Sequence, residues 1–117
     1  MNITHAFLGV PVTDFSAAYG WYERLFDRPA DMVPKPGDAV WHLAPRVSIY
    51  VVDDPGRAGS GLLTIAVPDL EALAARVGAG DVAIDASSSE PGPRRLVIRD
   101  GDGNSITFFE DPEPSNN

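Results

Sequence analysis

The 117-residue sequence contains no cysteine, which excludes disulfide bonds and thiolate metal sites. It is also poor in basic residues: nine Lys and Arg stand against seventeen Asp and Glu, giving a net charge of −8. An acidic surface repels phosphate backbones, so we expect no nucleic-acid partner. No apolar run approaches the roughly 18 residues that a membrane-spanning helix needs, and the N-terminus lacks the basic residues of a signal peptide. We therefore expect a cytoplasmic protein with no membrane partner, and its composition is typical of GC-rich bacteria.

One eight-residue segment occurs twice in the chain. It reads SIYVVDDP at residues 48–55 and SITFFEDP at 105–112, with Ser, Ile, Asp and Pro at matching places. The likeness extends to LGVPVTDF at 8–15 and LTIAVPDL at 63–70, where apolar residues alternate up to an aspartate, as in a half-buried strand. Apolar residues then recur at helical spacing in both halves. The pattern predicts a duplicated module.

Each half is predicted to run strand, helix and three strands. The helices should begin after the capping residues Thr13 or Asp14 and Asp69, and Gly78 and Gly80 are natural stops for the second helix. The expected strands are 8–12, 30–34 and 39–44, then 63–67, 81–86 and 94–99, and the repeated octets at 48–55 and 105–112 close the two halves. Loops are expected at 34–37, 54–61 and 87–93, with a tight turn at 100–104. We expect one α+β domain over 1–112, with modules at 3–54 and 61–112 and a polar tail at 113–117.

The duplicated βαβββ order, the V-x-D…WYERLF opening and the RDGDGNSITFFEDP ending resemble the vicinal-oxygen-chelate superfamily. That superfamily includes glyoxalase I, extradiol dioxygenases, fosfomycin-resistance transferases and bleomycin-resistance proteins. The resemblance covers nearly all of residues 3–112, with Gly101 where the family's ending has proline. It implies two tandem modules that form a curled mixed sheet around a cleft, and a homodimer. The sequence leaves open whether the cleft forms within one chain or across the dimer.

The resemblance also implies where relatives hold a divalent metal. On the first strand of each half, the ligand lies seven residues before the aspartate of V-x-D, which gives Phe7 and Leu62. On the last strand, it is the fourth residue after the glycine of the DGN turn, which gives Thr107, and the repeat carries that position onto Tyr50. None of these side chains holds Zn, Ni, Fe or Mn at neutral pH. We therefore expect no metal and no cofactor.

Two other metal arrangements can be weighed against this expectation. A relocated site would need His5 or His42, the only histidines, and strand alternation turns Glu110 away from the cleft. The turn at 100–104 is similar to a calcium loop, but Ser105 stands where that loop requires glycine. The hairpin interpretation is therefore preferred.

Strand alternation predicts a mostly apolar, aromatic cleft with a few hydroxyl groups. The positions that face inward are His5, Phe7, Gly9, Ser48, Tyr50, Val52, Leu62, Thr64, Ala66, Ser105, Thr107 and Phe109, with either Trp41 or His42. The candidate ligand-binding residues among them are Phe7, Trp41, His42, Tyr50, Leu62, Thr64, Thr107 and Phe109. The alternative is that these side chains fill the barrel and leave no cavity.

Two functions follow from such a cleft. The first is non-catalytic binding of an aromatic or cationic small molecule by stacking and cation–π contacts, as the resemblance to bleomycin-resistance proteins implies. The second is a metal-free enzyme of lyase or isomerase type. It would use His42 or His5 as acid or base and Tyr50 as a hydrogen-bond donor to an oxyanion. A metal-dependent glyoxalase or dioxygenase with a relocated site comes third.

Overall fold

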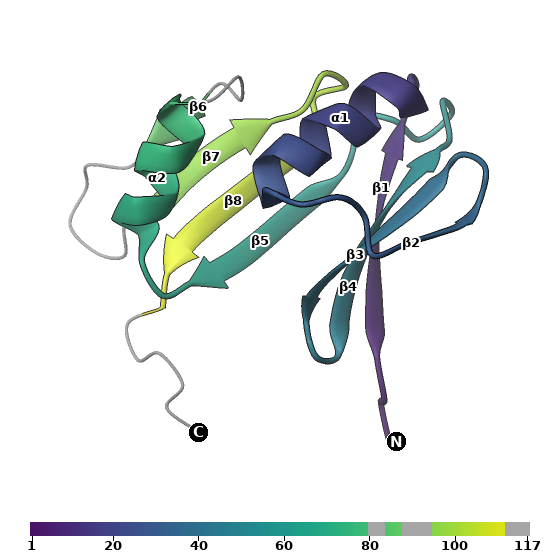
Figure 1. The fold of residues 1–117 in the computed structure, drawn as a ribbon, viewed down its shortest axis with the longest axis horizontal. Helices are drawn as coiled ribbons and strands as arrows, with labels where there is room; N and C mark the ends of the chain where they lie inside the picture. Colours follow the sequence, from purple (N-terminus) through teal and green to yellow (C-terminus); the bar gives the residue numbers. More distant parts are fainter. Residues whose placement is uncertain (80–83, 88–94, 112–117) are drawn as a thin grey trace.

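The computed structural model describes residues 1–79, 84–87 and 95–111. Its elements are β1 (Ala6–Val12), α1 (Phe15–Phe26), β2 (Met32–Lys35), β3 (Asp38–Ala44), β4 (Val47–Asp53), β5 (Leu62–Val67), α2 (Leu70–Ala79), β6 (Ile84–Ser87), β7 (Arg95–Arg99) and β8 (Ser105–Glu110). They form two βαβββ modules, each with one four-stranded sheet (Figure 1). The predicted α+β class and tandem repeat are confirmed. Within the described part of the chain, neither helix is long and apolar enough to cross a membrane.

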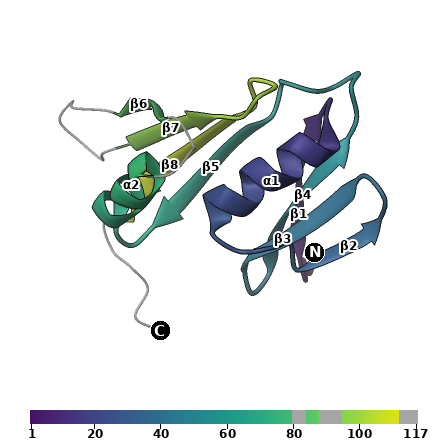
Figure 2. The same cartoon turned by 45° about the horizontal axis from the view of Figure 1, so that its top comes forward.

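The two sheets have the same strand order, β1-β4-β3-β2 in the first and β5-β8-β7-β6 in the second. In each module the first strand pairs in parallel with the last, so Ile49 lies opposite Leu8 and Ile106 lies opposite Leu63. The other strand pairs are antiparallel. The strands predicted to carry the cleft residues therefore lie side by side in each sheet (Figure 2).

Both helices begin at the predicted aspartates. Asp14 Oδ1 accepts a hydrogen bond from the backbone N–H of Ala17 at 3.1 Å, and Asp69 Oδ1 accepts one from Ala72 at 3.0 Å. Each carboxylate satisfies a backbone donor that the first helical turn leaves unpaired. α1 ends at Phe26, and the capping residue Asp27 that follows adopts a left-handed conformation with φ of 58°. α2 continues through Gly78 to Ala79, so the predicted stop at Gly78 is one residue early.

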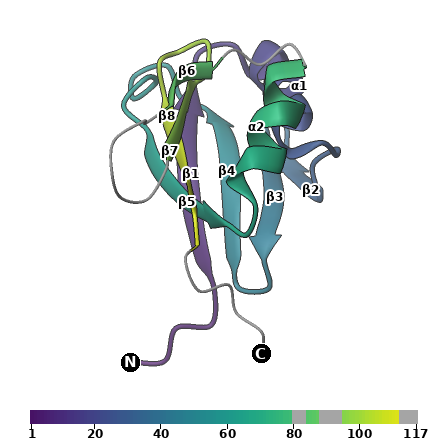
Figure 3. The same ribbon diagram turned by 90° about the vertical axis from the view of Figure 1, so that its left-hand side faces the viewer.

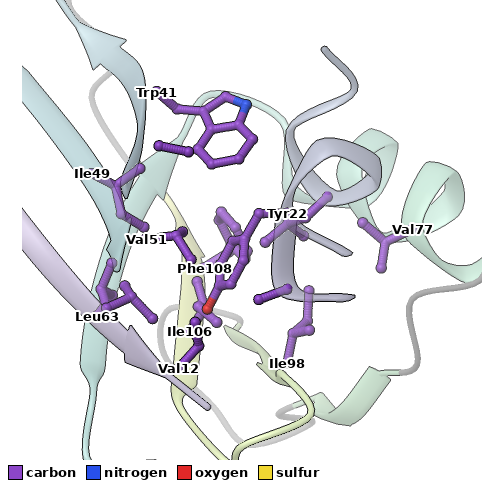
Figure 4. Close-up of a cluster of buried hydrophobic side chains, with 14 of the residues drawn as sticks. Val12, Tyr22, Trp41, Ile49, Val51, Leu63, Val77, Ile98, Ile106 and Phe108 are labelled. Atoms are coloured by element: carbon purple, nitrogen blue, oxygen red, sulfur yellow. The ribbon is translucent and has the colours of Figure 1, made fainter. Parts of the chain in front are cut away.

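The helix-covered faces of the two sheets share one hydrophobic core. It contains Val10, Val12, Trp41, Ile49 and Val51 from the first sheet, Leu63, Leu96, Ile98, Ile106 and Phe108 from the second, and Tyr22 and Leu25 from α1 (Figure 4). Both helices lie on the same side of the molecule in Figure 3. The opposite sheet faces, which carry the predicted cleft residues, therefore point away from the core, and Phe7 and Leu62 on these faces are exposed.

One predicted loop is partly strand. Pro34 and Lys35 belong to β2, and only Pro36 and Gly37 form the turn that follows. Proline is tolerated in β2 because this is an edge strand and its pairing with β3 is irregular.

The other predicted connections have different outcomes. The loop at 54–61 and the turn at 100–104 are confirmed. Ser87 ends β6. The rest of the predicted loop at 87–93, Gly80 and the tail at 113–117 lie outside the described residues.

The turn at 100–104 holds the two modules together through Asn104, whose side chain is fully buried. Its Nδ2 donates to the carbonyl oxygen of Pro11 at 2.8 Å and to Asp100 Oδ2 at 2.9 Å. Its Oδ1 accepts from the backbone N–H of Gly61 at 2.7 Å. One side chain of the second module therefore fixes the end of β1 and the linker between the modules.

Tyr22 joins the same turn from α1. Its hydroxyl donates to Asp100 Oδ2 at 2.7 Å, and both side chains are buried. Burial, together with the neighbouring Asp100 carboxylate, raises the pKa of Tyr22 well above its ordinary value. Next to them, Asp102 Oδ1 accepts from the Thr13 hydroxyl at 2.7 Å. The turn is thus occupied by contacts within the chain, in agreement with the hairpin interpretation.

Candidate functional site

The open face of the first sheet is built around Tyr50. This residue lies on β4, and the strand register places it opposite Gly9 of β1. A Cβ atom at Gly9 would approach the Tyr50 Cζ and hydroxyl oxygen to 2.7 Å, which real Cβ atoms do not do. Gly9 therefore leaves the space in which the Tyr50 ring lies over β1.

A hollow of about 410 Å³ lies beside the Tyr50 ring, and we call it the Tyr50 pocket. It is lined by Gly9, Pro11, Tyr50 and Val52 from the sheet and by Asp54, Gly56, Arg57, Ser60 and Gly61 from the linker. Small-molecule sites in proteins typically occupy about 300–1,000 Å³ and combine apolar walls with a few polar groups. The Tyr50 pocket meets both conditions. Sequence reasoning missed the linker residues because alternation along a strand gives no signal for a loop that folds over the sheet.

Both histidines of the chain lie on this same face and meet at one serine. His5 Nε2 and His42 Nδ1 each lie 2.7 Å from Ser48 Oγ. Register explains the meeting, because Ser48 is directly opposite His42 on β3 and opposite Phe7 on β1. The His5 ring stacks on Phe7 with a centroid separation of 4.3 Å. Ser48 was predicted to face inward but was not among the candidate site residues, although its position across from His42 was the available signal.

A second hollow of about 420 Å³ borders the two imidazoles, and we call it the histidine pocket. Its lining residues are His5, His42, Leu43, Ala44 and Pro45. The backbone of His42 is fixed on both sides: its N–H donates to Asp31 Oδ2 at 2.7 Å, and its carbonyl oxygen accepts from the Arg28 guanidinium. Arg28 and Asp31 in turn form an ion pair at 3.2 Å. The backbone of His42 is therefore held in place near the end of β3.

Trp41 does not belong to this face, which corrects its place among the candidate ligand-binding residues. Its side chain is fully buried in the core, and its Nε1 donates to the carbonyl oxygen of Arg28 at 3.0 Å. Its ring packs against Tyr19 of α1 at a centroid distance of 5.3 Å. Because neighbouring strand residues face opposite sides, burial of Trp41 places His42 on the open face.

The open face of the second sheet is simpler. Leu62 is 80% exposed and Phe7 of the first sheet is 55% exposed, which is unusual for side chains of this size. Thr64 and Thr107 lie directly opposite each other on β5 and β8, and Phe109 is partly buried on the same face. This face offers apolar surface and two hydroxyl groups.

Solved structures that resemble the chain include a glyoxalase/bleomycin resistance protein from Catenulispora acidiphila. The two are 33% identical with a TM-score of 0.88, and the match covers 92% of this chain and 98% of that one. The chain belongs to the glyoxalase/bleomycin-resistance family. Comparison with family sequence models and with curated protein sequences gives no match.

Two further structures show the breadth of the fold. TnmS3 from Streptomyces sp. CB03234, an antibiotic binding protein, is 27% identical with a TM-score of 0.74, over 94% of this chain and 98% of that one. A lactoylglutathione lyase from Agrobacterium tumefaciens is 21% identical with a TM-score of 0.73, over 90% and 91%. The latter likeness concerns the fold alone.

The positions that the resemblance to the superfamily assigns to metal ligands carry side chains that do not fit a divalent metal. They carry Phe7, Tyr50, Leu62 and Thr107, which supply two hydrocarbon side chains and two hydroxyl groups. Glu110 does not replace them, because its Oε1 accepts from the backbone N–H of Leu70 at the start of α2, at 3.2 Å. Among residues 1–79, 84–87 and 95–111, no three His, Cys, Asp or Glu side chains gather as metal ligands would.

Proposed function

We propose that this family member binds a small aromatic molecule in the Tyr50 pocket, without metal and without changing the molecule chemically. The observation that carries the proposal is the pocket itself, a hollow of about 410 Å³ with an aromatic wall and a polar rim. The Tyr50 ring offers an apolar face for stacking, and its hydroxyl offers a hydrogen bond at the edge. The likeness to TnmS3, an antibiotic binding protein, supports the same reading.

The charged residues at the rim of the pocket and the net charge of the chain indicate which ligand charge is favoured. The net charge of −8 disfavours an anionic ligand. Asp54 lines the rim, but Arg57 lies 3.7 Å from its carboxylate and partly offsets its charge. The preferred ligand is therefore neutral or singly cationic, and a cation would gain from the Tyr50 ring as well.

We further propose a homodimer in the cytoplasm, in which the open face of the second sheet covers the open face of the partner's first sheet. Leu62 and Phe7 are the large apolar side chains that such an interface would bury, at roughly 25 cal/mol per Å² of apolar surface. Leu62→Asp should then convert the dimer to a monomer in size-exclusion chromatography with light scattering. A wild-type chain that runs as a monomer at high concentration would refute this part.

A thermal-shift screen of neutral and cationic aromatic compounds tests the binding proposal. At a ligand concentration one hundred times the Kd, binding should add about 2.7 kcal/mol to the unfolding free energy. Tyr50→Leu should weaken the binding of a compound that stacks on the ring by about tenfold. At the same ligand concentration, this removes roughly half of the gain in unfolding free energy. Added Ni, Zn, Mn or Fe should leave the affinity unchanged.

Tyr19→Leu is the matched control for Tyr50→Leu. Tyr19 lies on α1 on the core side of the sheet, where its hydroxyl oxygen accepts from the backbone N–H of Ala30 at 3.1 Å. This variant should lower the melting temperature of the free protein but leave the ligand-induced shift intact. Equal ligand shifts in Tyr50→Leu and in the wild type would refute a site at the Tyr50 pocket.

A metal-free enzyme is the second candidate, and the meeting of His5, His42 and Ser48 is the observation that favours it. Either imidazole could act as acid or base toward a molecule that spans both pockets, with Tyr50 donating to a developing oxyanion. For a compound that is turned over, His5→Ala and His42→Ala should abolish turnover and spare binding. Unchanged rates in both variants would rule the enzyme out.

A further inference from the structure

We propose that His5, Ser48 and His42 form a coupled recognition site, in which both imidazoles share one tautomer and bind a neutral group that offers one hydrogen-bond donor and one acceptor. A carboxamide is the simplest group of this class. The proposal rests on the three side chains and on the histidine pocket, and it does not depend on binding in the Tyr50 pocket.

The first step concerns the Ser48 hydroxyl, which has one proton to donate and lone pairs to accept. It is fully buried, and its only hydrogen-bond partners among the described residues are His5 Nε2 and His42 Nδ1, both at 2.7 Å. A buried hydroxyl proton without an acceptor is costly. Ser48 therefore donates to one imidazole and accepts an N–H from the other.

The second step follows from the ring chemistry of neutral histidine, which has one protonated nitrogen. If His5 donates from Nε2, then Ser48 donates to His42 Nδ1, and the proton of His42 must be on its Nε2. If Ser48 instead donates to His5 Nε2, both rings carry their proton on Nδ1. In either case the two rings have the same tautomer, and Ser48 couples one to the other.

The third step concerns the two outer nitrogens, His5 Nδ1 and His42 Nε2. Neither makes a hydrogen bond to another side chain or backbone group in the described part of the chain. In each of the two shared tautomers, one outer nitrogen is a donor and the other is an acceptor. Both rings border the same hollow of about 420 Å³.

The ligand class follows from this pairing. A neutral carboxamide supplies an N–H for the acceptor nitrogen and a carbonyl oxygen for the donor nitrogen. Because the tautomer can switch through Ser48, the site accepts the group in either orientation. A ketone of the same shape has no donor and satisfies only one ring, while a carboxylate also lacks a donor.

Nitrogen NMR of the imidazoles tests the coupling in the wild-type protein without any substitution. The chain has only two histidines, so the four ring nitrogens can be assigned with His5→Gln and His42→Gln. At about pH 8.5, where ordinary imidazoles are neutral, both rings should show the same tautomer. Opposite tautomers, with both rings donating to Ser48, would overturn the proposal.

Benzamide and acetophenone, two probes of similar shape, test the ligand class. Millimolar benzamide should shift the outer ring nitrogens, and acetophenone should bind about fivefold more weakly because it leaves one hydrogen bond unmade. Ser48→Ala should change the chemical shifts of the inner ring nitrogens, His5 Nε2 and His42 Nδ1. It should also weaken the binding of benzamide by about the same factor of five. Ser105→Ala, at the matching place in the repeat, is the control and should change neither. Equal binding of the two probes, no response to benzamide, or unchanged ring shifts in Ser48→Ala would each refute the site.

Discussion

Asn104→Ala tests whether one buried amide holds the two modules together. The substitution leaves the N–H of Gly61 and the carbonyl oxygen of Pro11 without their partners at 2.7 and 2.8 Å. Asp100 loses the hydrogen bond from Asn104 but keeps the one from the Tyr22 hydroxyl, so it contributes less to the destabilisation than the two backbone groups. An orphaned polar group costs about 1–3 kcal/mol, and both backbone groups are only partly buried, so we expect a loss of about 2–4 kcal/mol. The free energy of unfolding of most domains is about 5–15 kcal/mol, so the variant should still fold.

Urea unfolding followed by tryptophan fluorescence measures this loss, and the melting temperature should fall by roughly 10 °C for a chain of this length. Asn2→Ala, at an exposed position, is the matched control and should change neither value. Asn104→Asp keeps an acceptor for Gly61 but places a second oxygen against Pro11 and Asp100. It should be at least as destabilised as the alanine variant at neutral pH. A change in unfolding free energy within about 0.5 kcal/mol of the control would refute this account of the turn.

Two further predictions follow from the same contacts. The folded state holds the Tyr22 proton more tightly than the unfolded state, so wild-type stability should fall above about pH 10 by up to 1.36 kcal/mol per pH unit. Tyr22→Phe should remove that fall, and it should lower the unfolding free energy by about 1.5–3 kcal/mol at pH 8 because Asp100 loses a hydrogen-bond donor. Unfolding free energies from urea titrations that follow parallel curves against pH in the variant and the wild type would contradict this. Gly9→Ala should displace the Tyr50 ring and weaken a Tyr50-pocket ligand by roughly two- to tenfold while stability changes by less than about 1 kcal/mol. Gly101→Ala, where a Cβ meets nothing within 4 Å, is its control, and equal affinities in the two variants would exclude the predicted displacement.

The order of the elements and the facing of most strands could be predicted from sequence because strand alternation and the repeat give independent, local signals. The helix caps at Asp14 and Asp69 follow from the same local chemistry. The place of Trp41 could not be predicted, because an indole fits an aromatic cleft and a core equally well until α1 is packed against it. The linker over Tyr50 and the contact of His5 with Ser48 depend on how distant segments meet, which no local pattern encodes.

Identical residues at matching places in the two copies of the repeat have different surroundings in the folded chain. Ile49 and Ile106 occupy equivalent places and are both fully buried, so their shape is constrained by the shared core. Ser48 and Ser105 are also equivalent and chemically identical, yet only Ser48 has two imidazoles across from it. Sequence identity at a repeated position therefore does not imply equal chemistry, because the neighbouring strands supply the partners. The open face of the first sheet therefore carries the two imidazoles and Ser48, and the open face of the second sheet carries apolar surface and two threonine hydroxyl groups.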